Sequence, residues 1–124
     1  MRPQDFYTRT RSSRGVRAEL ADPDGNREWV LVRSVLSAEF VAVAAAVARR
    51  AERYRALIDS AGPVERKRLG RMRRATLASA LVAEWSLPIK TPAEVADLLA
   101  INPRLRRQIE RISENHALHF GVAE

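Results

Sequence analysis

Two histidines and two aspartates have the spacing that comes closest to a chemical site. His116 and His119 lie nearly one helical turn apart and could share a metal ion, but only one glutamate and one asparagine lie near them as further donors. Asp22 and Asp24 lie in a turn that its proline and glycine explain, and the other ligands of a calcium loop are missing. Isolated glycines and the absence of cysteine exclude a phosphate-binding loop and thiol chemistry. We therefore expect no enzyme activity, no metal site and no cofactor.

Arginine is the residue type that most clearly points to a binding function. The 124 residues include 20 arginines and two lysines, and the net charge is +7. A basic surface attracts nucleic acid, acidic protein faces or anionic membranes. Because the charges are dispersed rather than gathered in one stripe, they favour a basic protein–protein surface over a dedicated nucleic-acid site.

Length and composition limit the elements that can position these side chains. The length predicts one domain with a modest core. Apolar residues make up 46% and aromatic residues only 6%, so alanine and aliphatic side chains must supply the packing, which favours helices. No apolar run approaches the ~18 residues of a membrane-spanning helix, and no apolar segment follows the first basic residues as in a secretory signal. We expect a flexible basic arm at residues 1–14 and a single domain at residues 15–124.

Residues 15–35 have the alternation of a β-hairpin. Val16 and Leu20 alternate with charged residues, and a turn with proline and glycine follows. After the turn, Trp29 and Leu31 continue this apolar side, while Val30 and Val32 point the other way. Two strands alone are only marginally stable in water, so the hairpin must pack on a helix or pair with another subunit.

Residues 37–120 have helical spacing and clear start signals. Ser37 is the predicted N-cap of the first helix, and proline follows both Thr91 and Asn102 as it does at the first position of capped helices. We expect a mainly α fold in which the hairpin precedes four helices, two long, one short and one of medium length. Their predicted ranges are 37–59, 63–85, 92–100 and 103–120.

The first predicted helix contains the unusually thin segment VAVAAAVA at residues 41–48. Small side chains let another helix approach closely. The segment therefore predicts either a close helix pair within the chain or a contact between subunits, and the exposed edge of the hairpin is a second route to assembly. We expect the protein to form homo-oligomers.

Residues 91–112 allow an alternative function as a helix-turn-helix DNA-binding regulator. A short helix, a tight turn and a basic helix follow one another there, with Ala96 where the two helices would cross. The phase of the second helix opposes this reading. If Ile109 is the last core position of the motif, position 106 should also be apolar, but it is occupied by arginine. The nearest apolar side chain is Leu105, and a shift of one residue rotates a side chain by about 100° around the helix.

From residue 15 to residue 120 the chain resembles the tail assembly chaperones of long-tailed bacteriophages. That family has a hairpin with a charged turn, a helix start of the type Ser-Ala-Glu-Phe, a tryptophan followed by a proline-containing linker, a capped helix with a double leucine, and a final aromatic residue. The corresponding residues here are Asp22 to Gly25, Ser37 to Phe40, Trp85, Pro88, Thr91 to Val95, Leu98 and Leu99, and Phe120.

The resemblance implies a small, mainly helical protein of the host bacterial cytoplasm that self-associates and binds the tape measure protein. Such proteins keep this long helical client soluble until tail tube protein polymerises around it. A client of this kind needs an apolar groove, and Arg104 and Arg107 beside the groove would attract acidic segments. The competing interpretation makes the same apolar residues the domain core. The candidate groove residues are Trp85, Leu98, Leu99, Ile109 and Phe120.

Overall fold

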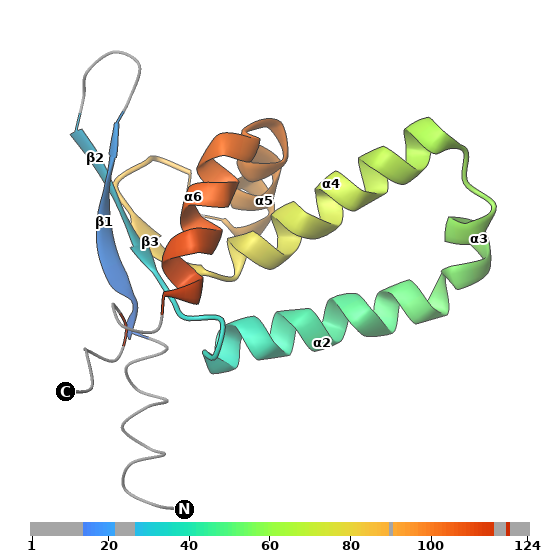
Figure 1. Ribbon diagram of the computed structural model, residues 1–124, viewed down its shortest axis with the longest axis horizontal. Coiled ribbons are helices and arrows are strands. Elements are labelled where there is room, and N and C mark those ends of the chain that lie inside the picture. Colours follow the sequence, from blue (N-terminus) through green and yellow to red (C-terminus); the bar gives the residue numbers. More distant parts are fainter. Residues whose placement is uncertain (1–13, 22–26, 90, 116–118, 120–124) are drawn as a thin grey trace, which may run out of the picture.

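The computed structural model describes residues 14–21, 27–89, 91–115 and 119. A three-stranded antiparallel sheet lies at one end, helices pack beside it, and two helices extend to the far end (Figure 1). This mainly helical architecture with an N-terminal hairpin confirms the predicted fold class. The predictions for residues 1–13, for the hairpin turn, for His116 and for Phe120 lie outside the described residues.

The described residues form three strands and five helices. The strands are β1 (Val16–Ala21), β2 (Arg27–Val32) and β3 (Val82–Trp85), and their order in the sheet is β1-β2-β3. The helices are α2 (Ala38–Arg53), α3 (Arg55–Asp59), α4 (Pro63–Ser79), α5 (Pro92–Ile101) and α6 (Pro103–Glu114).

The predicted hairpin is confirmed in its position, but the face that it buries differs from the prediction: Val30 and Val32, rather than Trp29 and Leu31, share the buried face with Leu20. β1 and β2 pair antiparallel, with Val16 opposite Val32. Val30 and Val32 are fully buried, whereas Trp29 lies on the other face with the Arg17 guanidinium 4.8 Å from its ring centre. Two strands alone would be only marginally stable. Here one face of the hairpin packs on the helices, and a third strand extends the sheet.

The third strand corrects the prediction of one helix from Pro63 to Trp85. α4 ends at Ser79, and the last four residues of the predicted helix form β3. Trp85 pairs with Val30 of β2, and the side chains of both residues are buried. Helical spacing alone could not exclude a four-residue strand here, since so short an apolar run suits both structures. Pairing with the free edge of β2 decides the conformation.

Arg33 fixes the turn between α4 and β3. Its backbone N–H donates to the carbonyl oxygen of Leu81 at 2.6 Å. Its Nη1 donates to the carbonyl oxygens of Ala80 at 3.2 Å and Val82 at 3.3 Å. The side chain thereby donates to a carbonyl oxygen on each side of the turn, one at the end of α4 and one at the start of β3.

The first predicted long helix is interrupted near its end. Ser37 is the N-cap as predicted, and its Oγ accepts from the backbone N–H of Phe40 at 3.3 Å. The helical backbone breaks at Tyr54, so residues 55–59 form the separate short helix α3. This break raises the number of helices in the described chain from the expected four to five.

The last two helices begin where the capping signals predict. Thr91 accepts from the N–H of Glu94 and Asn102 accepts from the N–H of Leu105, both at 3.3 Å. The predicted phase of α6 is also confirmed, because Leu105 packs against the core while Arg106 pairs with Glu110 at 2.6 Å. α6 ends at Glu114 and is therefore shorter than predicted, although the final predicted residue, Phe120, is not described.

The core lies between the inner face of the sheet and the helices α4, α5 and α6. Two alanines of α4 face this core, and their small side chains allow α5 to approach closely. α2 contributes no fully buried residue. The buried apolar residues are Leu20, Val30, Val32, Ala75, Ala78, Leu81, Trp85, Val95, Ala96, Leu99 and Ile109.

Replacing Gly15 and Gly70 with alanine should change stability in opposite directions. Gly15 has φ of +87°, and an added Cβ would lie 2.9 Å from the carbonyl oxygen of Val32. We expect Gly15→Ala to lower the free energy of unfolding by about 2 kcal/mol. In Gly70→Ala the methyl group would meet only the Arg74 guanidinium, at 3.5 Å, so helix propensity should raise the free energy of unfolding by about 0.5–1 kcal/mol. Urea unfolding followed by circular dichroism measures both, and a loss in the Gly70 variant as large as in the Gly15 variant would contradict this prediction.

Candidate functional site

Three of the predicted groove residues belong to the core. Trp85 is 2% exposed, and Leu99 and Ile109 are fully buried. The indole N–H of Trp85 donates to the carbonyl oxygen of Ile89, so its polar atom is also satisfied within the chain. Leu98 is partly buried and packs against the same cluster. These side chains stabilise the fold and do not form an exposed groove.

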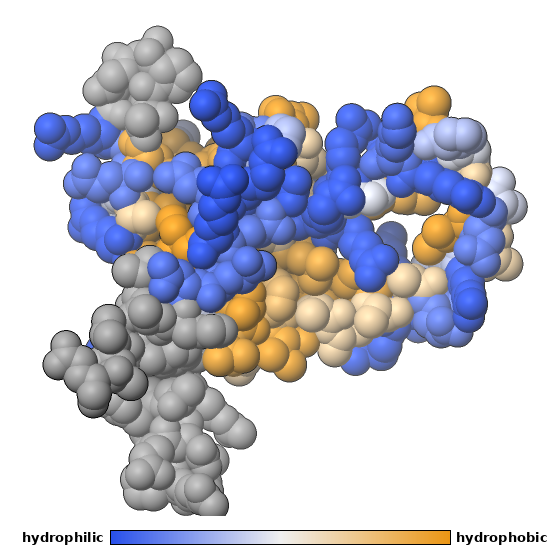
Figure 2. All heavy atoms as spheres, viewed as in Figure 1, coloured by the Kyte–Doolittle hydropathy of each residue, from blue (hydrophilic) through white to orange (hydrophobic). Residues whose placement is uncertain are grey.

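The exposed apolar surface lies on α2. None of the sixteen residues of this helix, all of which are described, is buried. One side, with Phe40, Val43 and Val47, is partly covered. The opposite side is exposed, and Figure 2 shows apolar residues gathered along α2. We call this side the α2 face; it consists of Ala38, Val41, Ala42, Ala45 and Ala48.

No charged side chain belongs to the α2 face. In the helix as a whole, Glu39 lies in the first turn, near Arg33, and the charged residues Arg49, Arg50, Glu52 and Arg53 follow the face in the last turns. Val41 is 56% exposed, and Leu36 just before the helix is 54% exposed. An amphipathic helix on a protein surface normally shows water a polar side. On α2 the side exposed to solvent consists of alanine and valine instead, and an exposed apolar surface of this kind is suited to binding a partner.

This surface belongs to a projecting structure. α2, α3 and the first half of α4 extend away from the sheet and from α5 and α6 (Figure 1). Exposed apolar residues continue at the end of this projection, where Tyr54 is 43%, Leu57 68% and Val64 82% exposed. We call this part of the molecule the helical arm.

A cavity lies where the helical arm joins the core. Its volume is about 390 Å³, and its walls come from the first turns of α2, the end of α4, β3 and the start of α5. Val43, Val82 and Val95 supply apolar walls. Arg33 and Glu39 also line it, with 4.0 Å between Arg33 Nε and a carboxylate oxygen of Glu39. The cavity is large enough for a bulky apolar side chain of a partner.

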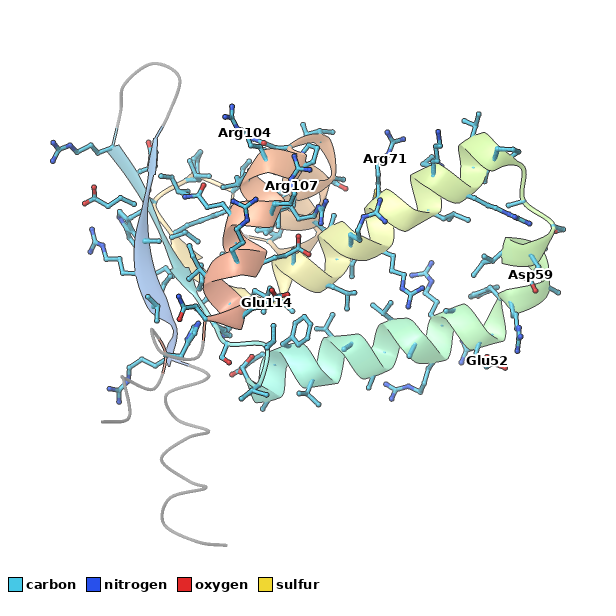
Figure 3. All side chains as sticks on the ribbon, viewed as in Figure 1. Glu52, Asp59, Arg71, Arg104, Arg107 and Glu114 are labelled. Atoms are coloured by element: carbon cyan, nitrogen blue, oxygen red, sulfur yellow. The ribbon has the colours of Figure 1, made fainter. Side chains whose placement is uncertain are left out.

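The predicted arginines Arg104 and Arg107 lie on a different surface. Both are exposed on the outward side of α6, together with Arg111. Figure 3 shows Arg104, Arg107 and Arg71 of α4 on the side of the molecule away from α2. None of these four arginines forms an ion pair with a described residue. They therefore do not flank the α2 face and form a separate basic surface.

Some arginines of the helical arm are paired. Arg68 of α4 binds Glu65 through two hydrogen bonds, of 2.7 and 3.0 Å. The Arg68 guanidinium lowers the pKa of the Glu65 carboxyl, mainly through this hydrogen bonding. Arg55 of α3 lies 3.9 Å from Glu52 and 4.0 Å from Asp59. Exposed pairs of this kind contribute little to stability, but they reduce the positive charge that the arm offers a partner.

The described residues contain no group of three or more metal-ligating side chains. His119 is buried, and its Nε2 lies 3.0 Å from the carbonyl oxygen of Ile112. None of the described helices is both long and apolar enough to cross a bilayer.

Sequence reasoning missed the α2 face as the main exposed apolar surface. The signal was present, because residues 41–48 are apolar on all sides of the helix, but helical spacing does not tell which side is covered. Chemically, the two surfaces are suited to binding: the α2 face to an apolar partner and the outward side of α6 to an anionic one. No family model, curated protein or solved structure matches this chain.

Proposed function

We propose that the protein is a bacteriophage tail assembly chaperone, which binds the tape measure protein in the host bacterial cytoplasm and keeps it soluble during tail morphogenesis. The observation that carries this proposal is the α2 face, an apolar helix surface displayed on a projecting arm. The sequence resemblance supplies the identity of the client.

The α2 face suits an amphipathic helix as its client. Alanine side chains are short, so a second helix can lie close along residues 38–48 and bury its apolar stripe. Leu36, which is 54% exposed, extends the apolar surface at one end. The cavity at the base of the arm lies on the opposite, partly covered side of α2, where Val43 lines it, and is not part of this surface. A long helical client presents many segments of this kind, and each would otherwise expose apolar surface that aggregates.

Charge would add selectivity to this contact. Arg49, Arg50 and Arg53 are exposed directly after the apolar part of α2. A client segment with acidic residues beyond its apolar stripe would be attracted to them, and its association rate would fall as salt is added. The arginines that flank the client on this proposal therefore lie on α2, in place of the predicted Arg104 and Arg107.

Self-association is part of the same proposal, and the edge of the sheet is the surface that supports it. Among the described strands, β1 pairs only with β2, so its outer edge presents backbone N–H and C=O groups. Such an edge is a template for pairing with another strand. Oligomers formed there would display several α2 faces to one long client, which raises the effective affinity without new contacts.

Co-expression with the tape measure protein tests the proposal. We expect the client to shift from the insoluble to the soluble fraction when the two proteins are produced together in bacteria. An unrelated basic protein of similar size is the control for a general effect of charge. An unchanged soluble fraction, or an equal gain with the control protein, would contradict the proposed function.

The alternative of a helix-turn-helix regulator at residues 91–112 is supported less well by the geometry. α5 and α6 are joined by Asn102 alone, whereas that motif uses a turn of about three to four residues. Leu105, rather than Arg106, faces the core, so the second helix presents a different side from the motif. A sequence-specific regulator is therefore not our proposal.

A further inference from the structure

We propose that the outward side of α6, together with Arg71 of α4, binds the phosphate backbone of duplex nucleic acid without reading its sequence. This basic surface lies on the side of the molecule away from α2 (Figure 3), so the inference goes beyond the proposed function and does not depend on it.

The first observation is the alignment of three arginines on one side of α6. Arg104, Arg107 and Arg111 are separated by three and four residues, which places them on one side of the helix over about 10 Å along its axis. All three are exposed, while the opposite side of α6 packs on the core through Leu105 and Ile109. The guanidinium groups are thus held on a rigid element.

The second observation is that these arginines lack partners while their neighbour does not. Arg106 has a side chain only 14% exposed and pairs with Glu110 at 2.6 Å. Arg104, Arg107 and Arg111 form no ion pair with any residue in the described part of the chain. α6 therefore has one arginine that serves the fold and three whose donors face solvent.

The chemistry of the surface favours nucleic acid over a protein as its partner. Apart from Pro103, the exposed residues of α6 are all polar or charged: three arginines, Gln108 and Glu114. Specific protein interfaces need a desolvated core with apolar or aromatic side chains, and the outward side of α6 offers none. Arginine binds phosphate oxygens through paired N–H donors, and phosphate contacts require no apolar surface.

The dimensions also fit a duplex. α6 has 12 residues and is therefore about 18 Å long, and the major groove, about 12 Å wide, admits a helix. Arg71 extends the positive surface onto α4. The exposed side of α5 carries Glu94 and Asp97, and Glu114 follows Arg111 by three residues on the same side of α6. The binding surface on these helices is therefore limited to residues 104–111. With Gln108 as the only neutral polar side chain exposed on α6, we expect contacts to phosphates rather than to base edges.

The test compares two charge-reversed proteins of equal net charge. In one, Arg104, Arg107 and Arg111 become glutamate; in the control, Arg49, Arg50 and Arg53 of α2 become glutamate. Binding of a fluorescent random-sequence duplex of about 20 base pairs is measured by anisotropy over a range of salt concentrations. We expect the α6 variant to bind about 10- to 100-fold more weakly, and the slope of log Kd against log salt to fall by about 3, one for each lost phosphate contact.

The control variant should keep most of the affinity. Equal losses in both variants would show that only the overall charge attracts DNA, and would overturn the proposal. Competition by polyglutamate as effective as that by unlabelled duplex would point to an acidic protein partner and would also overturn it. Circular dichroism checks the fold of both proteins. If the glutamate variant of α6 does not fold, the corresponding arginine-to-glutamine variant should still show at least half of the expected change in slope.

Discussion

Replacing Val41 and Ala45 with glutamate is expected to abolish client binding while leaving the fold intact. Both residues lie in the centre of the α2 face and are exposed, and glutamate is a good helix former, so the free chain should tolerate the change. In the complex both carboxylates would be buried, and Arg49, one turn after position 45, can pair with only one of them. The other is buried without a partner, which costs about 3 kcal/mol or more. That cost corresponds to a loss of affinity of about a hundredfold or more. Co-expression with the tape measure protein is the measurement, and the client should return to the insoluble fraction.

The matched control adds the same two charges elsewhere. Val64 is 82% exposed and Ile101 is 81% exposed, and neither belongs to the α2 face. The double variant with glutamate at these two positions should keep the client soluble. Because we attribute self-association to β1, light scattering should give the same molar mass for both variants and the parent protein. Loss of client solubility in the control as well would contradict the assignment of the site to α2.

Replacing Trp85 with alanine should have the largest effect on stability. The substitution removes a side chain that is 2% exposed, packs where β3 pairs with β2, and donates a hydrogen bond to the carbonyl oxygen of Ile89. Replacing a buried tryptophan with alanine typically costs about 3–5 kcal/mol. For a domain whose free energy of unfolding is about 5–15 kcal/mol, this is a large share of the total. Urea unfolding followed by circular dichroism measures the loss.

Two further substitutions make this prediction specific. Leu57→Ala removes an apolar side chain that is 68% exposed, and it should change the free energy of unfolding by less than about 0.5 kcal/mol. Trp85→Phe keeps most of the volume but loses the N–H donor, and we expect a cost of about 1–3 kcal/mol. If Trp85→Ala costs no more than Leu57→Ala, Trp85 is a surface residue and the placement of β3 is wrong.

Much of the fold follows from signals that act within a few residues of the sequence. The alternation of β1 and β2 and the helix starts at Ser37, Thr91 and Asn102 all rest on local backbone and side-chain preferences, and the structure confirms them. The phase that turns Leu105 toward the core was also readable, because a one-residue shift rotates a helical side chain by about 100°. The exclusion of a catalytic or metal site among the residues of the sequence rested on the same kind of local spacing and stays a prediction.

Only the tertiary structure decided what happens at Trp85 and on α2. The segment 82–85 is too short for its own sequence pattern to predict a strand. It becomes β3 because β2, about fifty residues earlier, offers a free edge for pairing. Arg33 stabilises the turn between α4 and β3 through its hydrogen bonds. Likewise, an apolar helix does not reveal which of its sides another element will cover. The core forms between the sheet and the helices α4, α5 and α6, and these contacts bury Trp85, Leu99 and Ile109. The α2 face lies outside these contacts and stays exposed. Burial depends on contacts between segments that are distant in the sequence, so local patterns could not predict it.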